Sequence, residues 1–535
     1  MPQSNQFSRV FAHRSAECFF VIMCLFLTCV LRVAVIVTGN YSEVQAKQSR
    51  LTVSAGAVRG TVFDCNRVPI TNAESKIMAA VSPTPRAVTA ISGVIEGEEL
   101  KSILERLKSG KPVVCEVPYS IECDGISCTT VYKHNSSDTP AIHLVGYTDS
   151  ENHGVSGLES AYDSLLYRNT GVNFVYTTDG RGNVLEGIAP TVENDTSAAA
   201  SGVVSTIDIN IQHIAEEAAE SLETGAIVIA DAKTNKIRAS VSVPTFDCTD
   251  ISEYLNSTDS PLLNRALAAY SVGSVFKPCV AVAGIETEKS DYIYTCTGKC
   301  QIADRVFKCH KKEGHGTVGL KEAIAFSCNT FFYNFSDEIG GNVIYKTASV
   351  LSFGQKQKIC DGIYTSAGSI PSAESLENPA ALANFSIGQG TLSVSPVGML
   401  NLYSAIASNG TYYRPSLVEG TLDGGSFKKY DIGSPTRVMK SDTAELLRQC
   451  LTAVIDEGTG TAAKPDTVTA AGKTATAQTG KFENGAEICE AWFCGFFPAE
   501  DPIYTVIVFS QNSNRQTLSC GEIFAQIADR IYALG

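Results

Sequence analysis

Three short motifs in this chain carry the residue types needed for acyl transfer. Ser274 is followed by Lys277, Ser327 and Asn329 share one tripeptide, and Lys473 begins a third motif. A serine hydroxyl becomes a strong nucleophile when a base takes its proton, and a neutral lysine one helical turn away can do so. The second serine can relay protons and the asparagine can hold a substrate amide. The late lysine can attract a substrate carboxylate and lower the pKa of the first lysine.

The residues around Ser274 predict that it lies at a helix start. Gly273 precedes it, and Pro278 follows Lys277. Proline is tolerated in the first helical turn because its missing N–H has no partner there. The backbone N–H of Ser274 then points outward, and the helix dipole favours a developing oxyanion. A helix cap alone would explain this serine but not the other two motifs, so the combination favours a catalytic role.

These motifs resemble those of the penicillin-binding proteins, specifically the monofunctional class B transpeptidases that cross-link peptidoglycan. Further segments in the family's order extend the resemblance from Arg59 to the C-terminus, with gaps between residues 73 and 139. They are Arg59-Gly60-Thr61-Val62-Phe63-Asp64, Gly154-Val155-Ser156-Gly157-Leu158-Glu159 with Tyr162-Asp163, Thr206-Ile207-Asp208, Asn264-Arg265-Ala266, Gly314-His315-Gly316-Thr317, Gly388-Gln389-Gly390 and Glu457-Gly458-Thr459-Gly460-Thr461.

The resemblance implies an α+β fold of the penicillin-binding and serine β-lactamase type. An antiparallel sheet is flanked by helices, with an all-helical half from Pro278 to about Ser404. An extended N-terminal pedestal domain and one transmembrane helix precede it, as 535 residues exceed what one core usually serves. The expected parts are a cytoplasmic tail (1–17), a membrane anchor (18–37), a connector (38–54), a pedestal or dimerisation domain (55–195) and a transpeptidase domain (196–535).

The resemblance also implies a role for each motif residue. Lys277, as a neutral base, takes the Ser274 proton as Oγ attacks a D-Ala-D-Ala stem peptide. Ser327 and Lys473 pass a proton to the departing D-alanine, and Asn329 holds the donor amide. Two threonines complete the expected site: Thr474 binds the terminal carboxylate, and the backbone N–H groups of Ser274 and Thr476 form the oxyanion hole. An amine of a neighbouring stem peptide takes the acyl group, and no metal or cofactor is needed.

One departure from the family lies inside the site. Ala475 stands where the family usually has glycine after Lys473-Thr474, and glycine on such a strand lets backbone and ligand approach closely. A methyl group that crowds the pocket slows acylation, whereas one that points away changes nothing. We expect a working but slower transpeptidase. The alternative is a catalytically weakened scaffold that partners a cell-wall glycosyltransferase. Cys65-Asn66-Arg67 also replaces the family's usual Arg-Asn-Gly, outside the chemistry.

Other enzyme and receptor classes fit less well. His315 lies in a Gly-His-Gly-Thr segment that favours a turn, and no motif surrounds the other six histidines, which disfavours a histidine triad. A β-lactamase is far shorter and lacks a pedestal, and a β-lactam sensor needs a signalling module. The net charge of -14 and the lack of basic runs disfavour nucleic acid as a partner.

A membrane anchor is expected near the N-terminus. Residues 18–37 are apolar or small except for Arg32, which can snorkel to the headgroups. Arg9 and Arg14 precede this span, which favours a cytoplasmic N-terminus and an extracytoplasmic catalytic domain in a single-pass membrane protein. A cleaved signal peptide is the alternative, with Val44-Gln45-Ala46 as a poor cleavage site. The expected partners are stem peptides, β-lactams and a membrane-embedded glycosyltransferase.

Fifteen of the 18 cysteines follow the anchor. Cys296, Cys300, Cys309 and His310 are close enough in sequence to raise a zinc site, but their spacing is not a standard one and the adjacent Cys-His pair would strain a tetrahedron. A disulfide between Cys296 and Cys309 is favoured over that site, and free thiols remain an equal alternative.

Apolar runs separated by turns, together with helical periodicity, predict the elements around the motifs. Residues 225–230 and 236–243 predict a hairpin, and residues 492–497 and 503–509 predict two more antiparallel strands. Apolar faces near residues 211–222 and 523–534 predict two helices that pack on the same sheet. Residues 473–478 are expected on the adjoining strand, facing the Ser274 helix, and residues 191–205 are expected to link the two domains.

The sequence leaves open whether the protein serves elongation, division or sporulation, and which acceptor stem it uses.

Overall fold

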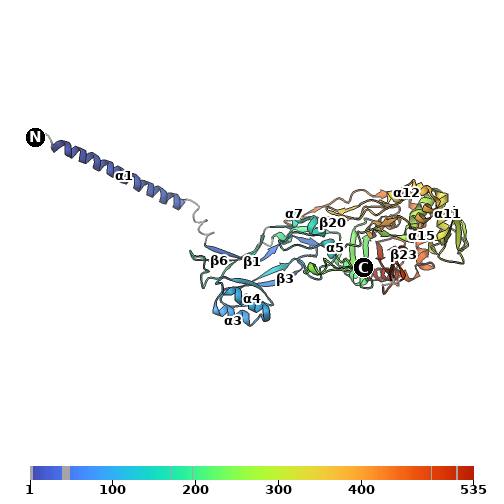
Figure 1. The fold of residues 1–535 in the computed structure, drawn as a ribbon, viewed down its shortest axis with the longest axis horizontal. Helices are drawn as coiled ribbons and strands as arrows, with labels where there is room; N and C mark the ends of the chain where they lie inside the picture. Colours follow the sequence, from blue (N-terminus) through green and yellow to red (C-terminus); the bar gives the residue numbers. More distant parts are fainter. Residues whose placement is uncertain (1–3, 39–48, 169, 195–196, 484, 514–515) are drawn as a thin grey trace. The chain divides into compact units, whose positions relative to one another are not determined.

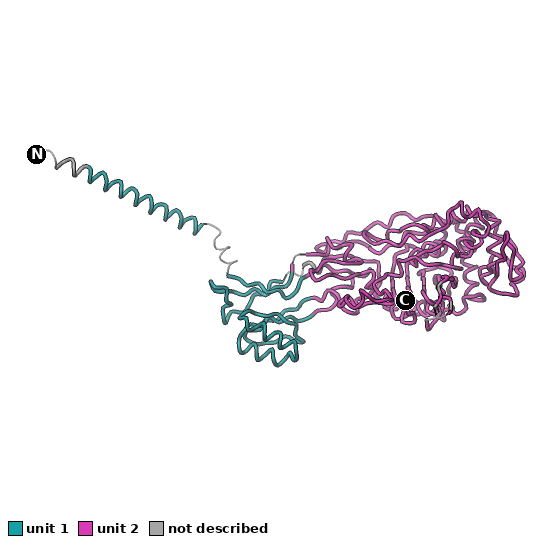
Figure 2. Tube along the Cα trace, in the orientation of Figure 1, with its two compact units in different colours: residues 1–57, 76–131, 171–195 teal, residues 58–75, 132–170, 196–535 magenta. Residues whose placement is uncertain are grey.

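The computed structural model describes residues 4–38, 49–168, 170–194, 197–483, 485–513 and 516–535. The chain forms two compact units, each made of segments that are discontinuous in sequence (Figure 2). Unit 1 comprises Met1–Ala57, Lys76–Val131 and Gly171–Asp195, and unit 2 comprises Val58–Ser75, Tyr132–Thr170 and Thr196–Gly535. The functional division at residue 195 stays a prediction. Most of the expected connector, the alternative cleavage site at 44–46 and linker residues 195 and 196 lie outside the described residues.

Unit 1 begins with a long apolar helix, α1 (Ser4–Thr38), labelled in Figure 1. Its segment Val10–Thr38 is long and apolar enough to cross a membrane, and its side chains are exposed in the structure. Exposure of apolar side chains to water is unfavourable, so a long helix that is apolar on all sides and exposed in the structure is a candidate membrane span.

After α1, the described residues of unit 1 form two three-stranded sheets and two helices. Thr84 caps helix α3 by accepting a hydrogen bond from the Ala87 amide, and Pro85 occupies the first turn. Ile91 and Leu107 pack against the strands in one small core. The elements are β1 (Arg50–Val58), β6 (Thr170–Thr177) and β7 (Thr191–Asn194) in one sheet, and β4 (Val113–Val117), β3 (Glu74–Val81) and β5 (Ile126–Lys133) in the other, with α3 (Pro85–Ser92) and α4 (Gly97–Leu107).

Unit 2 is built on a five-stranded antiparallel sheet. Its order is β10 (Ile237–Val243), β9 (Gly225–Asp231), β25 (Tyr504–Ser510), β24 (Ala486–Phe497) and β23 (Ala471–Glu483). Alternate residues of β9 and β25 enter different cores, because successive side chains of a strand point to opposite faces. Ile227 and Val506 face α8 (Ile209–Ala219) and α16 (Cys520–Tyr532), while Val228 and Ile507 face the helices of the other half. The predicted hairpin, adjoining strands and two packed helices are confirmed.

The other half of unit 2 has a helical framework. Its main helices are α9 (Lys277–Glu286), α10 (Leu320–Ala325), α11 (Asn329–Ile339), α12 (Gly341–Val350), α13 (Pro379–Ser386), α14 (Pro396–Ala407) and α15 (Ser441–Asp456). The expectation that this half is all-helical is wrong in detail, since two-stranded ribbons interrupt it. They pair β12 (Tyr294–Cys296) with β15 (Gly316–Val318), β13 (Lys299–Ile302) with β14 (Arg305–Lys308), and β16 (Lys358–Cys360) with β17 (Ile363–Tyr364).

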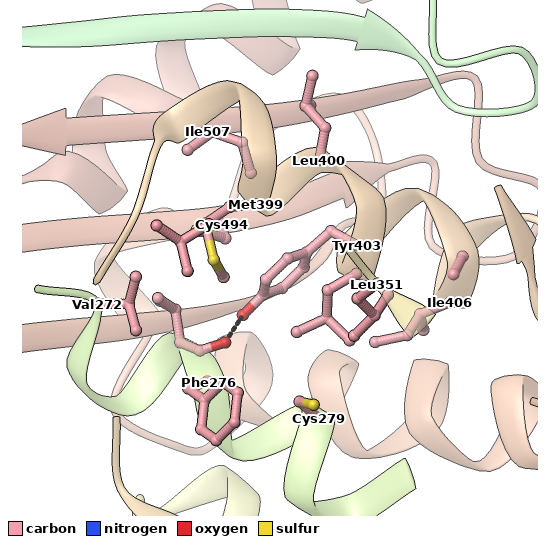
Figure 3. Close-up of a cluster of buried hydrophobic side chains, with 14 of the residues drawn as sticks. Val272, Phe276, Cys279, Leu351, Met399, Leu400, Tyr403, Ile406, Cys494 and Ile507 are labelled. Carbon is pink, nitrogen blue, oxygen red and sulfur yellow. Dashed lines mark hydrogen bonds between the residues drawn. The ribbon is translucent and has the colours of Figure 1, made fainter. Parts of the chain in front are cut away.

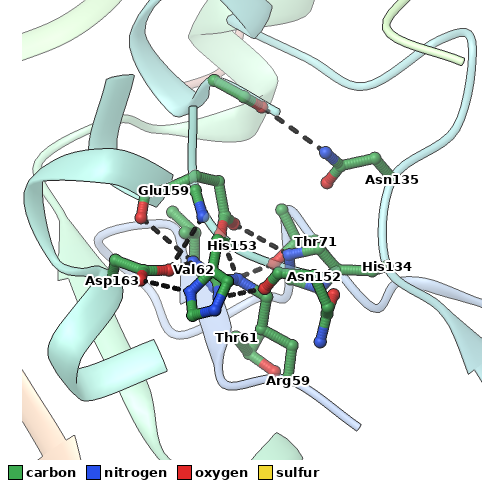
Figure 4. A network of polar contacts seen from close by, with 12 residues as sticks. Arg59, Thr61, Val62, Thr71, His134, Asn135, Asn152, His153, Glu159 and Asp163 are labelled. Atoms are coloured by element: carbon green, nitrogen blue, oxygen red, sulfur yellow. Dashed lines mark hydrogen bonds and ion pairs between the residues drawn. The ribbon is translucent and has the colours of Figure 1, made fainter. Parts of the chain in front are cut away.

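The N-terminal motifs of the resemblance meet in one buried ion network within unit 2 (Figure 4). Arg59 donates from Nε to Glu159 at 2.6 Å and forms an ion pair with Asp163 at 2.8 Å. His134 contacts the second Glu159 oxygen at 2.9 Å. Arg59 and Glu159 are fully buried, so each charge depends on the other for compensation. The network joins the short helices α6 (Gly157–Ala161) and α7 (Asp163–Leu166) to the start of β2 (Thr61–Phe63).

Strand β2 belongs to a second sheet of unit 2. Its order is β2, β8 (Gly202–Ser205), β20 (Val418–Asp423) and β21 (Ser426–Lys429). β2 runs parallel to β8, whereas β20 runs antiparallel to both of its neighbours. This pairing places the Arg59 motif next to β8, which comes some 140 residues later in the chain, and β8 in turn pairs with β20, which follows the helical half.

Candidate active site

Ser274 lies on a tight turn at the start of a helix, as the sequence predicts. A 3₁₀ turn covers Gly273–Phe276, and α9 begins at Lys277 with Pro278 in its first turn. The Gly273 amide donates to the carbonyl of Gly388 at 2.9 Å. Gly388 has φ +75°, and a Cβ atom there would lie 1.9 Å from the Gly273 oxygen. Only glycine permits this close approach, which holds the serine turn against a second loop.

Two buried side chains, Tyr403 and Trp492, donate hydrogen bonds to the backbone in and just before the turn that carries Ser274. The sequence did not indicate this role for either residue. The Tyr403 hydroxyl on α14 donates to the carbonyl of Val275 at 3.0 Å (Figure 3). The indole N–H of Trp492 on β24 donates to the carbonyl of Ser271 at 2.9 Å. A buried Tyr or Trp usually satisfies its polar atom, so each anchors the backbone at a fixed point. Neither residue lies in a motif that could have identified it.

Lys277 connects the first two motifs. Its Nζ lies 2.8 Å from the carbonyl oxygen of Ser327, 3.0 Å from Ser327 Oγ and 2.7 Å from Asn329 Oδ1. Ser327 Oγ in turn donates to Ser274 Oγ at 3.2 Å. The hydrogen bonds therefore run from Lys277 through Ser327 to Ser274, whereas the sequence suggested a direct contact between the first lysine and the first serine.

Ser327 adopts an unusual backbone conformation, with φ +54°. Non-glycine residues seldom occupy this left-handed region, and those that do cluster at functional sites where the surroundings hold them. The conformation turns both the carbonyl and the hydroxyl of Ser327 toward Lys277. The second motif thus contributes two acceptors from one residue.

Burial makes Lys277 a capable base. Its side chain is fully buried, and this desolvation lowers the pKa of Lys277 to about 7, while the nearby Cys328 and Cys309 thiols act in the opposite direction. A charged amine loses its hydration in such a place, so the neutral form is populated near neutral pH. The sequence attributed this effect to Lys473, whereas burial is the main cause.

The third motif lies on edge strand β23. Lys473 is fully buried, and its Nζ donates to the Thr474 carbonyl at 3.1 Å and lies 3.4 Å from Thr459 Oγ1. Thr459 also contacts Thr474 through the two hydroxyl groups at 2.9 Å. Burial, and then the positive charge of Lys277, holds the pKa of Lys473 well below its usual range. Thr459 lies in the Glu457-Gly458-Thr459-Gly460-Thr461 segment, for which the sequence alone predicts no specific role.

The alternation along β23 decides where the Ala475 methyl group points. Lys473, Ala475 and Ala477 are buried, whereas Thr474 is half-buried and Thr476 is exposed. A Cβ atom added to Gly273 would lie 3.5 Å from Ala475 Cβ and 3.4 Å from the carbonyl oxygen of Thr476. The Ala475 methyl group therefore packs beneath the turn that carries Ser274, on the strand face opposite to the two threonines.

The structure thus brings every predicted site residue into unit 2, around the start of α9. The predicted disulfide between Cys296 and Cys309 is wrong, since both are free thiols. They instead gather with His315 and Cys328 next to the second motif, whereas Cys300 and His310, their neighbours in sequence, do not belong to this group.

Comparison with known proteins identifies the family. Residues 225–533 match the penicillin binding protein transpeptidase domain, which is more than half of the chain. The chain is 27% identical over 512 residues to the stage V sporulation protein D of Bacillus subtilis, covering 88% of this chain and 77% of that protein. It is 26% identical over 434 residues to the peptidoglycan D,D-transpeptidase MrdA of Acinetobacter baumannii, covering 74% of this chain and 62% of that protein.

Solved structures share the fold. A crystal structure of penicillin binding protein 3 from Mycobacterium tuberculosis, complexed with aztreonam, matches with a TM-score of 0.65 and 24% identity, covering 90% of this chain and 97% of that one. Penicillin-binding protein PBP2 from Helicobacter pylori, in complex with MreC, matches with a TM-score of 0.67 and 20% identity, covering 91% of this chain and 99% of that one. The chain belongs to the penicillin-binding protein transpeptidase family, in its class B group.

Proposed function

We propose that this protein is a serine-type peptidoglycan D,D-transpeptidase that β-lactams acylate. The observation that carries the proposal is the hydrogen-bonded path from a fully buried Lys277 through Ser327 to Ser274, beside the edge strand that carries Lys473. The relatives named as D,D-transpeptidases support the same chemistry.

Acylation begins when Ser274 Oγ attacks the penultimate carbonyl of a stem peptide that ends in D-Ala-D-Ala. The Ser274 proton passes toward Lys277, and the Ser327 hydroxyl, which bonds to both groups, is placed to carry it. Backbone N–H groups of Ser274 and Thr476 stabilise the oxyanion, since the serine turn and β23 lie against each other. Collapse of the tetrahedral intermediate breaks the amide bond and leaves an acyl-enzyme.

The other motif residues bind the donor and assist the leaving group. Thr474 and Lys473 bind the terminal carboxylate, whose negative charge would raise the pKa of Lys473 toward the cationic form. Ser327 and Lys473 deliver the proton that the departing D-alanine amine needs. Asn329 holds the donor amide, with its Oδ1 already oriented by Lys277. An amine of a second stem peptide then attacks the acyl-enzyme, releases Ser274 and completes the cross-link.

A transpeptidation assay distinguishes this proposal from its alternatives. Full-length protein in detergent would receive a stem-peptide thioester as donor and a D-amino acid as acceptor, with Ser274→Ala as control. The proposal predicts an aminolysis product that requires Ser274. Hydrolysis alone would indicate a β-lactamase-like or carboxypeptidase activity, and a stable acyl-enzyme with no product would indicate a sensor.

The scaffold alternative rested on Ala475 alone. The Ala475 methyl group lies beneath the Ser274 turn and leaves Lys277, Ser327 and Lys473 in hydrogen-bonded positions. An inactive site would need a missing or displaced catalytic group, and each expected group is present. The active enzyme is therefore the better-supported function.

We further propose that α1 anchors the protein in the cell membrane with the catalytic unit outside the cytoplasm. Its apolar span Val10–Thr38 supports this placement, and Arg9 and Arg14 near its start favour a cytoplasmic N-terminus. Protease added to intact cells should degrade unit 2 and spare the N-terminal tail; release of the intact chain into the medium would contradict an anchor. A membrane-embedded glycosyltransferase remains the proposed partner, and the Helicobacter pylori protein solved in complex with MreC supports a role within a protein assembly.

A further inference from the structure

Three cysteines and one histidine converge next to the second motif. They are Cys296, Cys309, His315 and Cys328, and their Sγ and imidazole nitrogen atoms all lie within 4.8 Å of one another. The three cysteines are at most 5% exposed, and the histidine is half-buried. We refer to these four residues as the Cys3His cluster.

The distances in the cluster fit a tetrahedral ion. His315 Nδ1 lies 3.6 Å from Cys296 Sγ and 3.5 Å from Cys309 Sγ. Zinc–sulfur bonds of about 2.3 Å and zinc–nitrogen bonds of about 2.0–2.1 Å, at tetrahedral angles, place sulfur and nitrogen about 3.5 Å apart. These two sulfur–nitrogen distances therefore match the edges of a tetrahedral zinc site.

We propose that the Cys3His cluster binds one Zn²⁺ ion as a closed, four-coordinate structural site. Three thiols and one imidazole form a standard zinc ligand set, and soft sulfur ligands disfavour Mg²⁺ and Ca²⁺. Binding converts the three thiols to thiolates, and their protons pass to solvent. The site has no open position, so the ion takes no part in acyl transfer.

The local fold holds the ligands together through the backbone as well. Cys296 ends β12, and the Cys309 amide donates to the Gly298 carbonyl at 2.9 Å. Gly314 has φ +83°, and a Cβ atom there would lie 2.2 Å from the carbonyl oxygen of Cys296. Only glycine fits that contact, which brings the segment before His315 against the end of β12.

Cys300 and His310 are near the Cys3His cluster in sequence but are not members of it. Cys300 lies on β13 outside the cluster, and the exposed His310 places its Nδ1 4.0 Å from Cys309 Sγ. The spacing that looked unsuitable for zinc in the sequence came from including these two residues. The ligands instead include His315, from a segment assigned to a turn, and Cys328, from inside the second motif.

Cys328 links the cluster to catalysis. It lies between Ser327 and Asn329, and both of these residues bond to Lys277. A metal bond to Cys328 would fix the backbone next to Ser327, whose left-handed φ of +54° needs restraint from its surroundings. The cluster residues are therefore positioning residues for the second motif. This consequence rests on the proposed function, whereas metal binding does not.

Metal analysis of the full-length protein tests the site directly. Protein purified in detergent without chelators should contain about one zinc per chain by mass spectrometry, and Cys309→Ser and His315→Gln should lose most of it. Cys300→Ser, a matched cysteine on the adjacent ribbon, should keep its zinc. Protein that contains no zinc and takes up none from added Zn²⁺, or equal loss in Cys300→Ser, would overturn the proposal.

Cobalt substitution of the wild-type protein avoids dependence on folding of the variants. Co²⁺ should produce the intense visible and near-ultraviolet bands of a tetrahedral thiolate site, and these bands should disappear when Zn²⁺ displaces the Co²⁺. Weak bands typical of octahedral Co²⁺ would overturn the proposed site.

Removing zinc should also slow penicillin acylation at least about tenfold, as expected when reacting groups shift by about 1 Å. Zinc-loaded protein that penicillin fails to label would count against the proposed function and would leave the metal site supported.

Discussion

The side-chain nitrogen of Lys277 lies 3.0 Å from the hydroxyl oxygen of Ser327, and the Lys277 side chain is fully buried. Two consequences follow from this contact. The amine loses hydration, which favours its neutral form, and the Ser327 hydroxyl becomes the link between that amine and the nucleophile. The base and the proton path are thus set by one buried contact.

Acylation by penicillin should depend on pH through Lys277. The neutral amine is the active form, and its pKa is lowered to about 7 by burial. The second-order acylation rate should therefore fall about tenfold per unit below pH 7 and level off above about pH 8. Stopped-flow labelling with fluorescent penicillin measures it, with circular dichroism to verify folding at each pH. A rate that stays flat from pH 5 to pH 8 would contradict the assignment of Lys277 as the base.

The two lysines should respond differently to arginine. Lys277→Arg should reduce acylation about 10²–10⁴-fold, because a guanidinium does not deprotonate in proteins and cannot act as a base. Lys473→Arg retains a positive charge for the carboxylate and should keep acylation within about tenfold of the parent. Rate constants for both variants, with melting curves to establish folding, test this difference. Equal losses in the two variants would count against separate tasks.

Ala475→Gly should not accelerate acylation, contrary to the expectation from sequence. The Ala475 methyl group packs beneath Gly273 and does not face the threonine side of β23. Its removal leaves a gap under the Ser274 turn and adds a glycine to a strand, which costs about 0.5–1 kcal/mol. We expect a slightly lower melting temperature and an unchanged or lower acylation rate. A faster variant would show that the methyl group obstructs the pocket after all.

Glu159→Ala should destabilise unit 2 far more than a surface charge deletion does. Removing Glu159 leaves the fully buried Arg59 with less compensation, and breaking a buried ion pair costs about 3–5 kcal/mol. Since Asp163 still contacts Arg59, the lower end of this range is expected. The matched control is Glu193→Ala, which removes the exposed partner of Arg50 and should cost no more than about 1 kcal/mol. Thermal unfolding of both variants gives the comparison, and equal shifts would contradict the structural role of the network.

Local patterns were sufficient to predict the sheet around the site. A short apolar run at residues 225–230, followed by a turn, predicted strand β9, and the structure buries its side chains in the two cores on either face of the sheet. Motif spacing likewise identified Ser274 and Lys277, because a helical turn keeps residues three apart on one side. These features depend on neighbours in sequence, which is why the sequence predicts them.

Features that depend on distant segments could not be predicted. His315 and Cys328 lie 13 residues apart in sequence but belong to one cluster, and Tyr403 donates a hydrogen bond to Val275, which is 128 residues away in sequence. No local pattern distinguishes this histidine from a turn residue or this tyrosine from core. The same reason explains the wrong disulfide, since proximity in sequence suggested a pair where the fold assembles four ligands. The direction of the Ala475 methyl group also needed the three-dimensional position of the serine turn.

The most direct test of the central claim is to find the residue that penicillin acylates. Full-length protein would be incubated with fluorescent penicillin, digested, and its labelled peptide sequenced by mass spectrometry, with Ser274→Ala as control. The account predicts one adduct, on Ser274 Oγ, and no labelling of the folded Ser274→Ala protein. An adduct on Ser327, or persistent labelling of Ser274→Ala, would contradict it.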